Sequence, residues 1–474
     1  MKSKVINSVG IDIGTTTTQV IFSRLTLVDR APASRVSHYE FVERELVYES
    51  EVISTPITTD GYVIPEQLRN FILQQFECAG LELSDIETGA IIITGETSKA
   101  KNAREAVLTL AEQLGDFVVA TAGPHLESVI AGRGSGAAEV ASRQHRRVMN
   151  IDIGGGTSNY VVFEGDRVLD TACLNVGGHL IETDQKGKVR RIHPPARKII
   201  RSLFGEDITE KQLSTDHLRR VAACMADLIV SVINGEPSEL ACNLLMTPAL
   251  APASVERLYL SGGIGDCYYR MQTEPMTDFL YGDLGVLVAR ALLQHRELGA
   301  MEVLPPRQTL RATVIGAGSY TVSLSGSTIW LSTIKLPIKN IPVLHPYINW
   351  GAEQPAIADA VEEAALRMDI DPDSDQFAIA LDASMPSRYN AVQHAATSLA
   401  KFYQDHDNRG GEALVVVHHD VGKVLGMEMQ PLLPARPLAI IDEVYTRDGD
   451  YIDIGKSFFG GEIVPLTVKS LAFP

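Results

Sequence analysis

The sequence predicts an α/β protein with two duplicated lobes and an additional C-terminal α/β domain. Two segments, residues 10–18 and 150–158, repeat nearly the same order of residues, which indicates a duplication. Similar strands and helices are expected after each segment, and a third alternation of strands and helices follows in the last part of the chain. With 474 residues the chain is long enough for about three domains. We therefore expect a first lobe at 1–140, a second lobe at 141–330 and an accessory α/β domain at 331–474.

Each repeated segment reads as two short strands joined by a turn rich in glycine and hydroxyl groups. The first strand carries one aspartate, Asp12 in one repeat and Asp152 in the other. Glycines let backbone N–H groups approach a polyanion, hydroxyl groups add donors, and a nearby carboxylate can hold hydrated Mg²⁺ against phosphates. The expected phosphate-binding residues are Gly14, Thr15, Thr16 and Thr17 in the first turn, and Gly154, Gly155, Gly156 and Thr157 in the second. Either segment alone would fit an ordinary tight hairpin, but the pair predicts a nucleotide clamp in which Asp12 and Asp152 face each other and orient Mg²⁺.

A third glycine-rich motif lies further along the chain, where an apolar strand over residues 257–261 leads into Gly262, Gly263 and Gly265. Glycines at these positions let the backbone pass flat against an adenosine. In this order the three motifs resemble the phosphate-1, phosphate-2 and adenosine motifs of the actin, Hsp70 and sugar-kinase ATPase superfamily. The resemblance implies that the lobes are actin-like ATPase lobes, of the ribonuclease H-like fold, with ATP bound in the cleft between them.

The apolar pattern predicts the elements of both lobes in order. For the first lobe we expect strands over residues 7–13, 19–25, 45–54, 89–94 and 117–121, and helices over 64–80, 98–113 and 123–133. For the second lobe we expect strands over residues 147–152, 158–164, 168–175, 257–261 and 311–315, and helices over 212–233 and 283–295. A polar, basic insertion between residues 178 and 207 has no counterpart in the first lobe, and its charge predicts an exposed excursion.

The accessory domain is expected to contain a parallel sheet, because strands and helices alternate along it. The expected strands cover residues 377–381, 414–417 and 438–441, and the expected helices cover residues 387–403 and 421–428. A strand-rich tail follows from residue 451. We interpret its Asp453-Ile454-Gly455 sequence, which echoes the hairpin motif without the donor-rich turn, as a turn at a sheet edge.

Hydrolysis requires a positioned water, and ATPases of this superfamily place a glutamate or glutamine near the start of the helix that links the lobes. In this chain the expected acidic position falls on Gly123, so the sequence departs from that pattern. Glu127 lies one turn further along the same helix and is the nearest substitute, although it also fits an ordinary exposed helix glutamate. We therefore predict Asp12, Asp152 and Glu127 as the catalytic residues of a slow ATPase, with Asp12 and Asp152 also serving the metal.

Composition and charge argue against several classes of function. The net charge of −17 and the isoelectric point near 5.2 argue against nucleic acid or an anionic membrane as partner, because both require basic patches. The first residues lack the pattern of a signal peptide, and no apolar run is long enough to span a bilayer, so we expect a cytoplasmic protein. The five cysteines form no Cys-x-x-Cys pair and are expected to be buried free thiols.

Longer stretches resemble one particular family over nearly the whole chain. The stretches are residues 8–23, 89–96, 123–132, 449–455 and 468–474. They are similar to the ethanolamine ammonia-lyase reactivating factors of bacterial ethanolamine utilisation. The resemblance implies a chaperone that uses ATP and Mg²⁺, binds the inactivated lyase, releases damaged cobalamin and lets intact adenosylcobalamin enter. On position alone, the accessory domain and the basic insertion are candidate contacts with the lyase, and an association with the ethanolamine bacterial microcompartment is left open.

Two alternatives on the same fold stay open. A small-molecule, sugar-type kinase would require a substrate pocket and an aspartate base aimed at a hydroxyl group, and phosphate transfer to a sugar without the lyase would support it. An actin-like scaffold would polymerise under nucleotide control, and ATP-dependent sedimentation of filaments would support that alternative.

Overall fold

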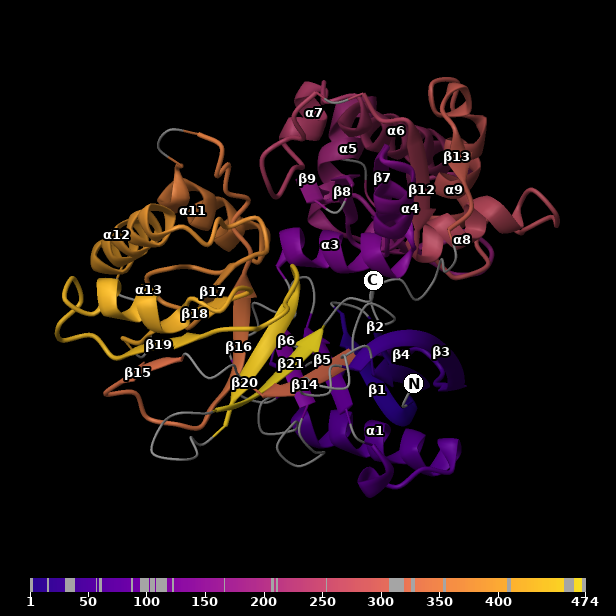
Figure 1. Cartoon of the computed structure of the whole chain (residues 1–474). Helices are drawn as coiled ribbons and strands as arrows, with labels where there is room; N and C mark the ends of the chain where they lie inside the picture. Colours follow the sequence, from indigo (N-terminus) through magenta and orange to yellow (C-terminus); the bar gives the residue numbers. More distant parts are fainter. Residues whose placement is uncertain are drawn as a thin grey trace.

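The computed structural model describes residues 3–14, 17–29, 39–56, 58, 62–86, 88–93, 102, 107, 117–121, 123–165, 167–205, 209, 212–252, 254–306, 319–324, 329–352, 355–406, 411–455 and 464–470. Figure 1 shows three bodies: a first lobe in indigo and purple, a second lobe in magenta and red above it, and a C-terminal domain in orange and yellow beside them. Thr15, Thr16, the predicted strand over 311–315 and most of the predicted helix over 98–113 lie outside the described residues.

The first lobe is built on one sheet with the strand order β3-β2-β1-β5-β6, and the short strand β4 pairs with β2. Its strands are β1 (Ser3–Ile13), β2 (Thr17–Asp29), β3 (Tyr39–Glu49), β4 (Ile53–Ser54), β5 (Thr88–Ile93) and β6 (Phe117–Thr121). Strands β1 to β3 are antiparallel, whereas β5 and β6 run parallel to β1. Helix α1 (Pro65–Ala79) buries Leu68, Ile72 and Phe76 in the core of this sheet, because these apolar residues share one helical face. The single turn η1 (Leu83–Asp85) follows α1.

The second lobe repeats this topology. Read from its antiparallel end, the strand order is β9-β8-β7-β12-β13, which is equivalent to β3-β2-β1-β5-β6. Its strands are β7 (Arg147–Ile153), β8 (Ser158–Glu164), β9 (Arg167–Leu174), β12 (Arg257–Ser261) and β13 (Val303–Leu304). Its helices are α5 (Pro194–Phe204), α6 (Thr215–Ile233), α7 (Glu239–Cys242), α8 (Gly262–Arg270) and α9 (Gly285–Gln294), with the short turns η3 (Gly178–Leu180) and η5 (Leu298–Ala300). The predicted duplication is therefore confirmed.

The basic insertion of the second lobe folds as a two-stranded hairpin followed by helix α5. Strands β10 (Ile181–Thr183) and β11 (Val189–Ile192) are antiparallel. Val189 and Ile192 are buried while Arg190 and Arg191 between them are exposed, as expected for a hairpin with one apolar face. The insertion is therefore attached to the core of the lobe and exposes its arginines.

Two helices connect the lobes. Helix α3 (Pro124–Gly134) follows β6 of the first sheet, and helix α4 (Ala137–Gln144) leads into β7 of the second. Both helices pack on the second sheet, α3 on β7, β8 and β9 and α4 on β7 and β8, although the expected limit at residue 140 places most of them in the first lobe. The domain limits at residues 140 and 330 stay predictions.

The C-terminal domain contains an eight-stranded sheet with the order β14-β21-β20-β16-β17-β18-β19-β15. Its strands are β14 (Ser319–Leu324), β15 (Trp330–Ser332), β16 (Ile338–Leu344), β17 (Ala378–Leu381), β18 (Ala413–Val417), β19 (Leu438–Ile441), β20 (Asp450–Ile454) and β21 (Pro465–Ser470). Strands β17 to β19 are parallel, as predicted, and β16, which the sequence analysis missed, pairs in parallel with β17. Helices α11 (Ile357–Arg367), α12 (Tyr389–Asp405) and α13 (Gly422–Met429) contribute to one core of the domain. The interpretation of Asp453 to Gly455 as an edge turn is wrong for Asp453 and Ile454, because β20 lies inside the sheet between β21 and β16.

The cysteines differ in part from the expectation. All five are free thiols, as predicted. Cys173 and Cys267 are buried and Cys224 is half-buried, whereas Cys78 and Cys242 are exposed, so the prediction of burial is wrong for these last two. In the part of the chain that the structure describes, no helix is long and apolar enough to cross a membrane.

Candidate functional site

The two hairpin turns have the same geometry. In the first, Asp12 lies opposite Gln19 and the Gly14 N–H donates to the Thr17 carbonyl oxygen at 2.9 Å. In the second, Asp152 lies opposite Asn159 and the Gly154 N–H donates to the Thr157 carbonyl oxygen at 3.0 Å. Equal spacing between aspartate and turn gives equal register, since side chains alternate faces along a strand. Each turn therefore presents its backbone at the end of a strand that carries the aspartate.

Asp152 lies in a buried polar cluster at the centre of the second sheet. The residue is only 9% exposed, and the Ser261 hydroxyl donates to Asp152 Oδ1 at 2.6 Å. Ser261 in turn accepts a hydrogen bond from Asn150 Nδ2 at 3.0 Å. Burial raises the pKa of Asp152 to about 6, while the Ser261 hydrogen bond acts in the opposite direction. A carboxylate with a raised pKa at the mouth of a glycine turn is typical of a functional site.

Oxygen atoms beside Asp152 suit a hard cation. Among the described residues, Asn150 Oδ1 and Asn159 Oδ1 are buried and have no hydrogen-bond partner, and such groups commonly indicate an absent ion or water. No group of three or more His, Cys, Asp or Glu residues in the described ranges is arranged to hold a metal. Mg²⁺ nevertheless fits, because it is usually bound through one or two carboxylates together with waters and substrate phosphates. The site thus has the donor set for Mg²⁺ delivered with a nucleotide.

The adenosine motif packs directly on the second hairpin. Gly262 has φ +78°, and a Cβ atom there would lie 2.5 Å from the carbonyl oxygen of Ile153. A Cβ atom at Gly265 would lie 2.8 Å from the carbonyl group of Leu260, whereas one at Gly263 would meet open space. Glycine is therefore required at Gly262 by both backbone angle and space. The structure brings the second and third motifs together, as the clamp requires.

A second pair of glycines, which sequence reasoning missed, supports the second turn from behind. A Cβ atom at Gly177 would lie 2.6 Å from the carbonyl oxygen of Gly155 and 2.7 Å from that of Gly154. The N–H groups of Gly178 and His179 donate to these same two carbonyl oxygens, to Gly154 at 3.0 Å and to Gly155 at 2.7 Å. The only signal in the sequence is a Gly-Gly pair shortly after β9. This contact fixes the orientation of the peptide groups in the turn.

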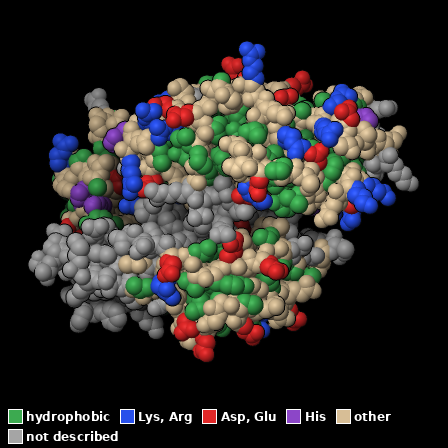
Figure 2. Space-filling model, turned by 90° about the vertical axis from the view of Figure 1, so that its right-hand side faces the viewer, with side chains coloured by type: hydrophobic (Ala, Val, Ile, Leu, Met, Phe, Trp, Pro, Cys, Tyr) green, Lys and Arg blue, Asp and Glu red, His purple; other side chains and the backbone are tan. Residues whose placement is uncertain are grey.

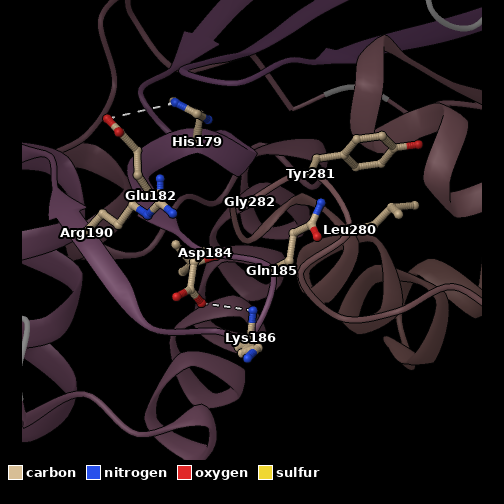
Figure 3. A pocket seen from close by; sticks show the side chains of 10 residues that line it. His179, Glu182, Asp184, Gln185, Lys186, Arg190, Leu280, Tyr281 and Gly282 are labelled. Atoms are coloured by element: carbon tan, nitrogen blue, oxygen red, sulfur yellow. Dashed lines mark hydrogen bonds and ion pairs between the residues drawn. The ribbon is translucent and has the colours of Figure 1, made fainter.

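An open pocket of about 690 Å³ continues from this contact (Figure 3). It is lined by His179, Glu182, Thr183, Asp184, Gln185, Lys186, Arg190, Leu280, Tyr281 and Gly282. His179 Nδ1 lies 3.5 Å from Asp283 Oδ2, and the hydrogen bond to Asp283 raises the pKa of His179 against the effect of burial. The pocket has the volume of a small-molecule site and combines an aromatic ring with both acidic and basic groups. The sequence analysis does not predict this pocket, because it treats residues 178–207, which form one wall, only as an exposed insertion.

The first hairpin is described in part. The Thr55 hydroxyl donates to the Gly14 carbonyl oxygen at 2.7 Å and lies 3.0 Å from the Thr18 hydroxyl, so this turn is also held from the side. Asp12 is half-buried and Thr17 is exposed, while Thr15 and Thr16 lie outside the described residues. Figure 1 shows β1 and β2 in the lower lobe and β7 and β8 in the upper one. That Asp12 and Asp152 face each other across the cleft stays a prediction.

Glu127 lies on the first turn of α3, the helix that connects the lobes, and is half-buried. Gly123, where the sequence leads us to expect an acidic residue, is the residue that precedes this helix. A Cβ atom at Gly123 would lie 2.4 Å from the carboxyl carbon of Asp369 in the C-terminal domain. The catalytic role of Glu127 stays a prediction.

The surface carries charges of both signs. On the face in Figure 2, Lys and Arg side chains lie among Asp and Glu side chains and do not gather in one basic patch.

Two equivalent sheets, a glycine turn at the same strand end in each, and a third glycine motif packed on the second turn define the actin-like ATPase fold class. The model of one protein family, described as ethanolamine utilisation protein EutA, matches residues 4–474. The chain belongs to this family.

Relatives and solved structures extend this comparison. The chain is 50% identical over 476 residues to a Salmonella typhimurium protein named ethanolamine ammonia-lyase reactivase EutA, and 49% identical over 476 residues to the Escherichia coli protein of the same name. Each alignment covers 100% of both chains. The solved Ppx/GppA enzyme of Aquifex aeolicus is 13% identical, with a TM-score of 0.40 over 66% of this chain and 99% of that chain. The solved ethanolamine utilization protein EutJ of Carboxydothermus hydrogenoformans is 15% identical, with a TM-score of 0.30 over 66% of this chain and 89% of that chain.

The pKa of Asp152 predicts how nucleotide binding depends on pH. If Asp152 orients Mg²⁺ as predicted, binding requires its carboxylate form, and the affinity for Mg²⁺–nucleotide should fall about fivefold from pH 6 to pH 5 through this group and level off above about pH 7. In the unliganded protein the buried carboxyl group is more stable in its neutral form. The free energy of unfolding therefore has its full value from this group below about pH 4 and decreases as the pH rises through about 6. Calorimetric titration from pH 5 to pH 8 measures the affinity, and Asp152→Asn should retain only the pH dependence of the nucleotide itself. Equal pH dependence in both proteins would contradict the assignment.

Proposed function

We propose that this protein is an ATP-dependent reactivating factor for ethanolamine ammonia-lyase in ethanolamine utilisation. The observation that carries the proposal is the identity of about half of all residues, over the full length, to two proteins named as reactivases of that lyase. The duplicated turns and the glycine motif packed on the second turn support a nucleotide as the source of free energy.

The nucleotide would lie between the lobes as a complex with Mg²⁺. The backbone of residues 154–157 and the turn at residues 14–17 would bind its phosphates, and Asp12 and Asp152 would orient the metal through its water shell. The pocket beside His179 has the size and polarity for the nucleoside, with Tyr281 as an aromatic surface for the base. When bound, Mg²⁺ neutralises charge on the phosphates and thereby assists cleavage of the terminal phosphoanhydride.

Residues of the chain would then couple hydrolysis to work on the lyase. The two turns belong to different lobes, so loss of the terminal phosphate removes an attraction that holds both lobes at one angle. One angle must bind the inactivated lyase better than the other, since a change of nucleotide can shift the complex only through differential affinity. Release of the damaged cobalamin and entry of intact adenosylcobalamin would follow from that shift. Glu127, at the start of α3, would position the attacking water.

A reactivation assay tests the proposal. Ethanolamine ammonia-lyase blocked with cyanocobalamin is incubated with this protein, ATP, Mg²⁺ and adenosylcobalamin, and deamination of ethanolamine is followed. We expect activity to return only when all four components are present, and a non-hydrolysable ATP analogue to fail in repeated cycles. Recovery that is unchanged when ATP is omitted would contradict the ATP dependence, and no recovery under any condition would contradict the proposal itself.

A further inference from the structure

The C-terminal domain reaches across to the first turn of helix α3. Asp369, which follows helix α11 of that domain, accepts a hydrogen bond from the Leu126 N–H at 2.7 Å, and the His125 N–H also contributes. Gly123, the residue before the helix, has no side chain with which to cap it. Since the first N–H groups of a helix have no partner within the helix, Asp369 supplies the cap that the chain lacks locally.

The Asp369 carboxyl group occupies the space of the missing side chain. A Cβ atom at Gly123 would lie 2.4 Å from Asp369 Cγ and 2.5 Å from its Oδ1. Any larger residue at position 123 would therefore displace Asp369. The position of the Asp369 carboxyl group, 243 residues beyond Leu126 in the chain, therefore depends on a glycine at position 123.

The backbone at Asp369 adopts the left-handed conformation, and its side chain is partly buried. Its φ is +53°, at the end of a helix where the left-handed conformation favours glycine. Burial raises the pKa of Asp369 to about 7, against the effect of its hydrogen bonds to Leu126 and His125. Burial of a carboxyl group is costly unless it is hydrogen-bonded, so the two N–H groups of α3 compensate part of that cost.

A second contact joins the same domain to strand β9. The Tyr347 hydroxyl accepts a hydrogen bond from the Val168 N–H at 3.0 Å and donates to Asp448. The guanidinium groups of Arg167 and Arg367 lie 5.2 Å and 4.2 Å from the centre of the Tyr347 ring. The C-terminal domain is therefore attached at two places, at the start of α3 and at β9.

Helix α3 packs into the cores of both the C-terminal domain and the second lobe. Leu126 and Ile130 are buried in the core of the C-terminal domain. Val129 is buried in a core shared with Val161 and Phe163 of the second lobe. The first lobe meets the C-terminal domain at strand β14, which lies beside β3 and β5. The hydrogen bonds described above therefore bind the domain to α3 and to the second lobe.

We infer that Asp369 and Tyr347 fasten the C-terminal domain to helix α3 and the second lobe, so that these parts move as one body against the first lobe. In this arrangement Asp369 is a positioning residue. The inference rests on the proposed function in one respect, that a nucleotide causes the movement. The attachment of the C-terminal domain to α3 and the second lobe is present in the protein without nucleotide.

Three spin labels can follow the three bodies separately. Cys78 on α1 and Cys242 on α7 are exposed thiols, and Lys401→Cys adds an exposed position on α12. Figure 1 shows these helices at the outer parts of the first lobe, the second lobe and the C-terminal domain. Labels should spare Cys224, because burial raises the pKa of this thiol to about 11. Each pair is labelled in a protein that lacks the third site, through Cys78→Ser, through Cys242→Ser or by keeping the native Lys401.

Double electron–electron resonance then measures the three distances without nucleotide, with Mg²⁺–ADP and with a non-hydrolysable Mg²⁺–ATP analogue. We expect the distance between the labels at positions 242 and 401 to keep one narrow distribution in all states, while both distances to the label on Cys78 change. A change between positions 242 and 401 as large as that between positions 78 and 242 would overturn the inference. If no nucleotide alters any distance, the proposed function is contradicted, and the variants below still decide the fastening.

An exchange of two residues separates the fastening from the helix cap. Asp369→Gly removes the contact and fits the φ of +53°, and adding Gly123→Asp returns a capping carboxylate to the same helix from within the chain. We expect both the single variant and the exchange variant to broaden the distance distribution between positions 242 and 401 at least twofold, and only the exchange variant to recover the midpoint of thermal unfolding.

Two further variants keep this test decisive. Tyr347→Phe removes the acceptor for the Val168 N–H and should broaden the same distance distribution. This variant replaces Asp369→Gly in the test if Asp369→Gly does not fold. Asp405→Asn, at an exposed carboxylate of the same domain, should leave the distribution unchanged. A narrow distribution in the exchange variant or in Tyr347→Phe would overturn the inference.

Discussion

Asp152→Asn is expected to lower ATP hydrolysis at least about 100-fold and to abolish reactivation of the lyase. The substitution keeps the size of the side chain and leaves an oxygen that can accept the Ser261 hydrogen bond of 2.6 Å. It removes the negative charge that would orient Mg²⁺ beside the turn at residues 154–157. The lower rate of hydrolysis therefore comes from weaker orientation of Mg²⁺–nucleotide, while the packing of the sheet is kept.

The same variant should fold as well as the wild type. Asp152 is only 9% exposed and burial raises its pKa to about 6, so its charge is a cost to the unliganded protein at neutral pH. We expect the midpoint of thermal unfolding without nucleotide to be equal or higher, and the gain in midpoint on adding Mg²⁺–ATP to be largely lost. Asp227→Asn, at a side chain that is 71% exposed in the same lobe, is the matched control. Hydrolysis within threefold of wild type would contradict the role of Asp152.

Gly177→Ala should weaken nucleotide binding about tenfold or more, although this residue would not itself touch the nucleotide. The new Cβ atom would lie 2.6 Å from the carbonyl group of Gly155, which is shorter than a van der Waals contact allows. The φ of Gly177 is −160°, an extended value open to any residue, so the effect is one of space alone. The second turn must move, at a cost of about 1–3 kcal/mol.

The measurement for this variant is a titration with a fluorescent nucleotide, together with thermal unfolding. Gly299→Ala is the control, because a Cβ atom there would meet nothing within 4 Å and its φ lies outside the left-handed region. We expect the control to bind nucleotide within twofold of wild type. Equal affinity in both alanine variants would show that the contact behind the turn does not shape the site.

The sequence predicts the strands of the hairpins well because their signal is local. Asp12 and Asp152 each precede a glycine turn by the same spacing, and strand register follows from such spacing. The parallel strands of the C-terminal domain are predicted for a similar reason, since alternating strands and helices require crossover connections.

Other features depend on residues that are distant in the chain. Gly177 supports the second turn only because β9 returns to it, and Asp369 reaches Leu126 across 243 residues. Asp453 resembles a hairpin turn locally, yet its strand lies between β21 and β16. Pairing partners of this kind are set by tertiary structure, which neither residue spacing nor composition encodes in one sequence.

The most direct test of the two-sided clamp is a double-mutant cycle on Asp12 and Asp152, read by calorimetric titration with Mg²⁺–ATP. The wild type should bind one nucleotide per chain, and Asp12→Asn and Asp152→Asn should each weaken binding. If both carboxylates orient one ion, the double variant should bind scarcely more weakly than whichever single variant binds less tightly. Once the first substitution has removed the ion from its position, the second substitution has little further effect. Fully additive losses, or unchanged affinity in Asp12→Asn, would contradict a single metal held between the two lobes.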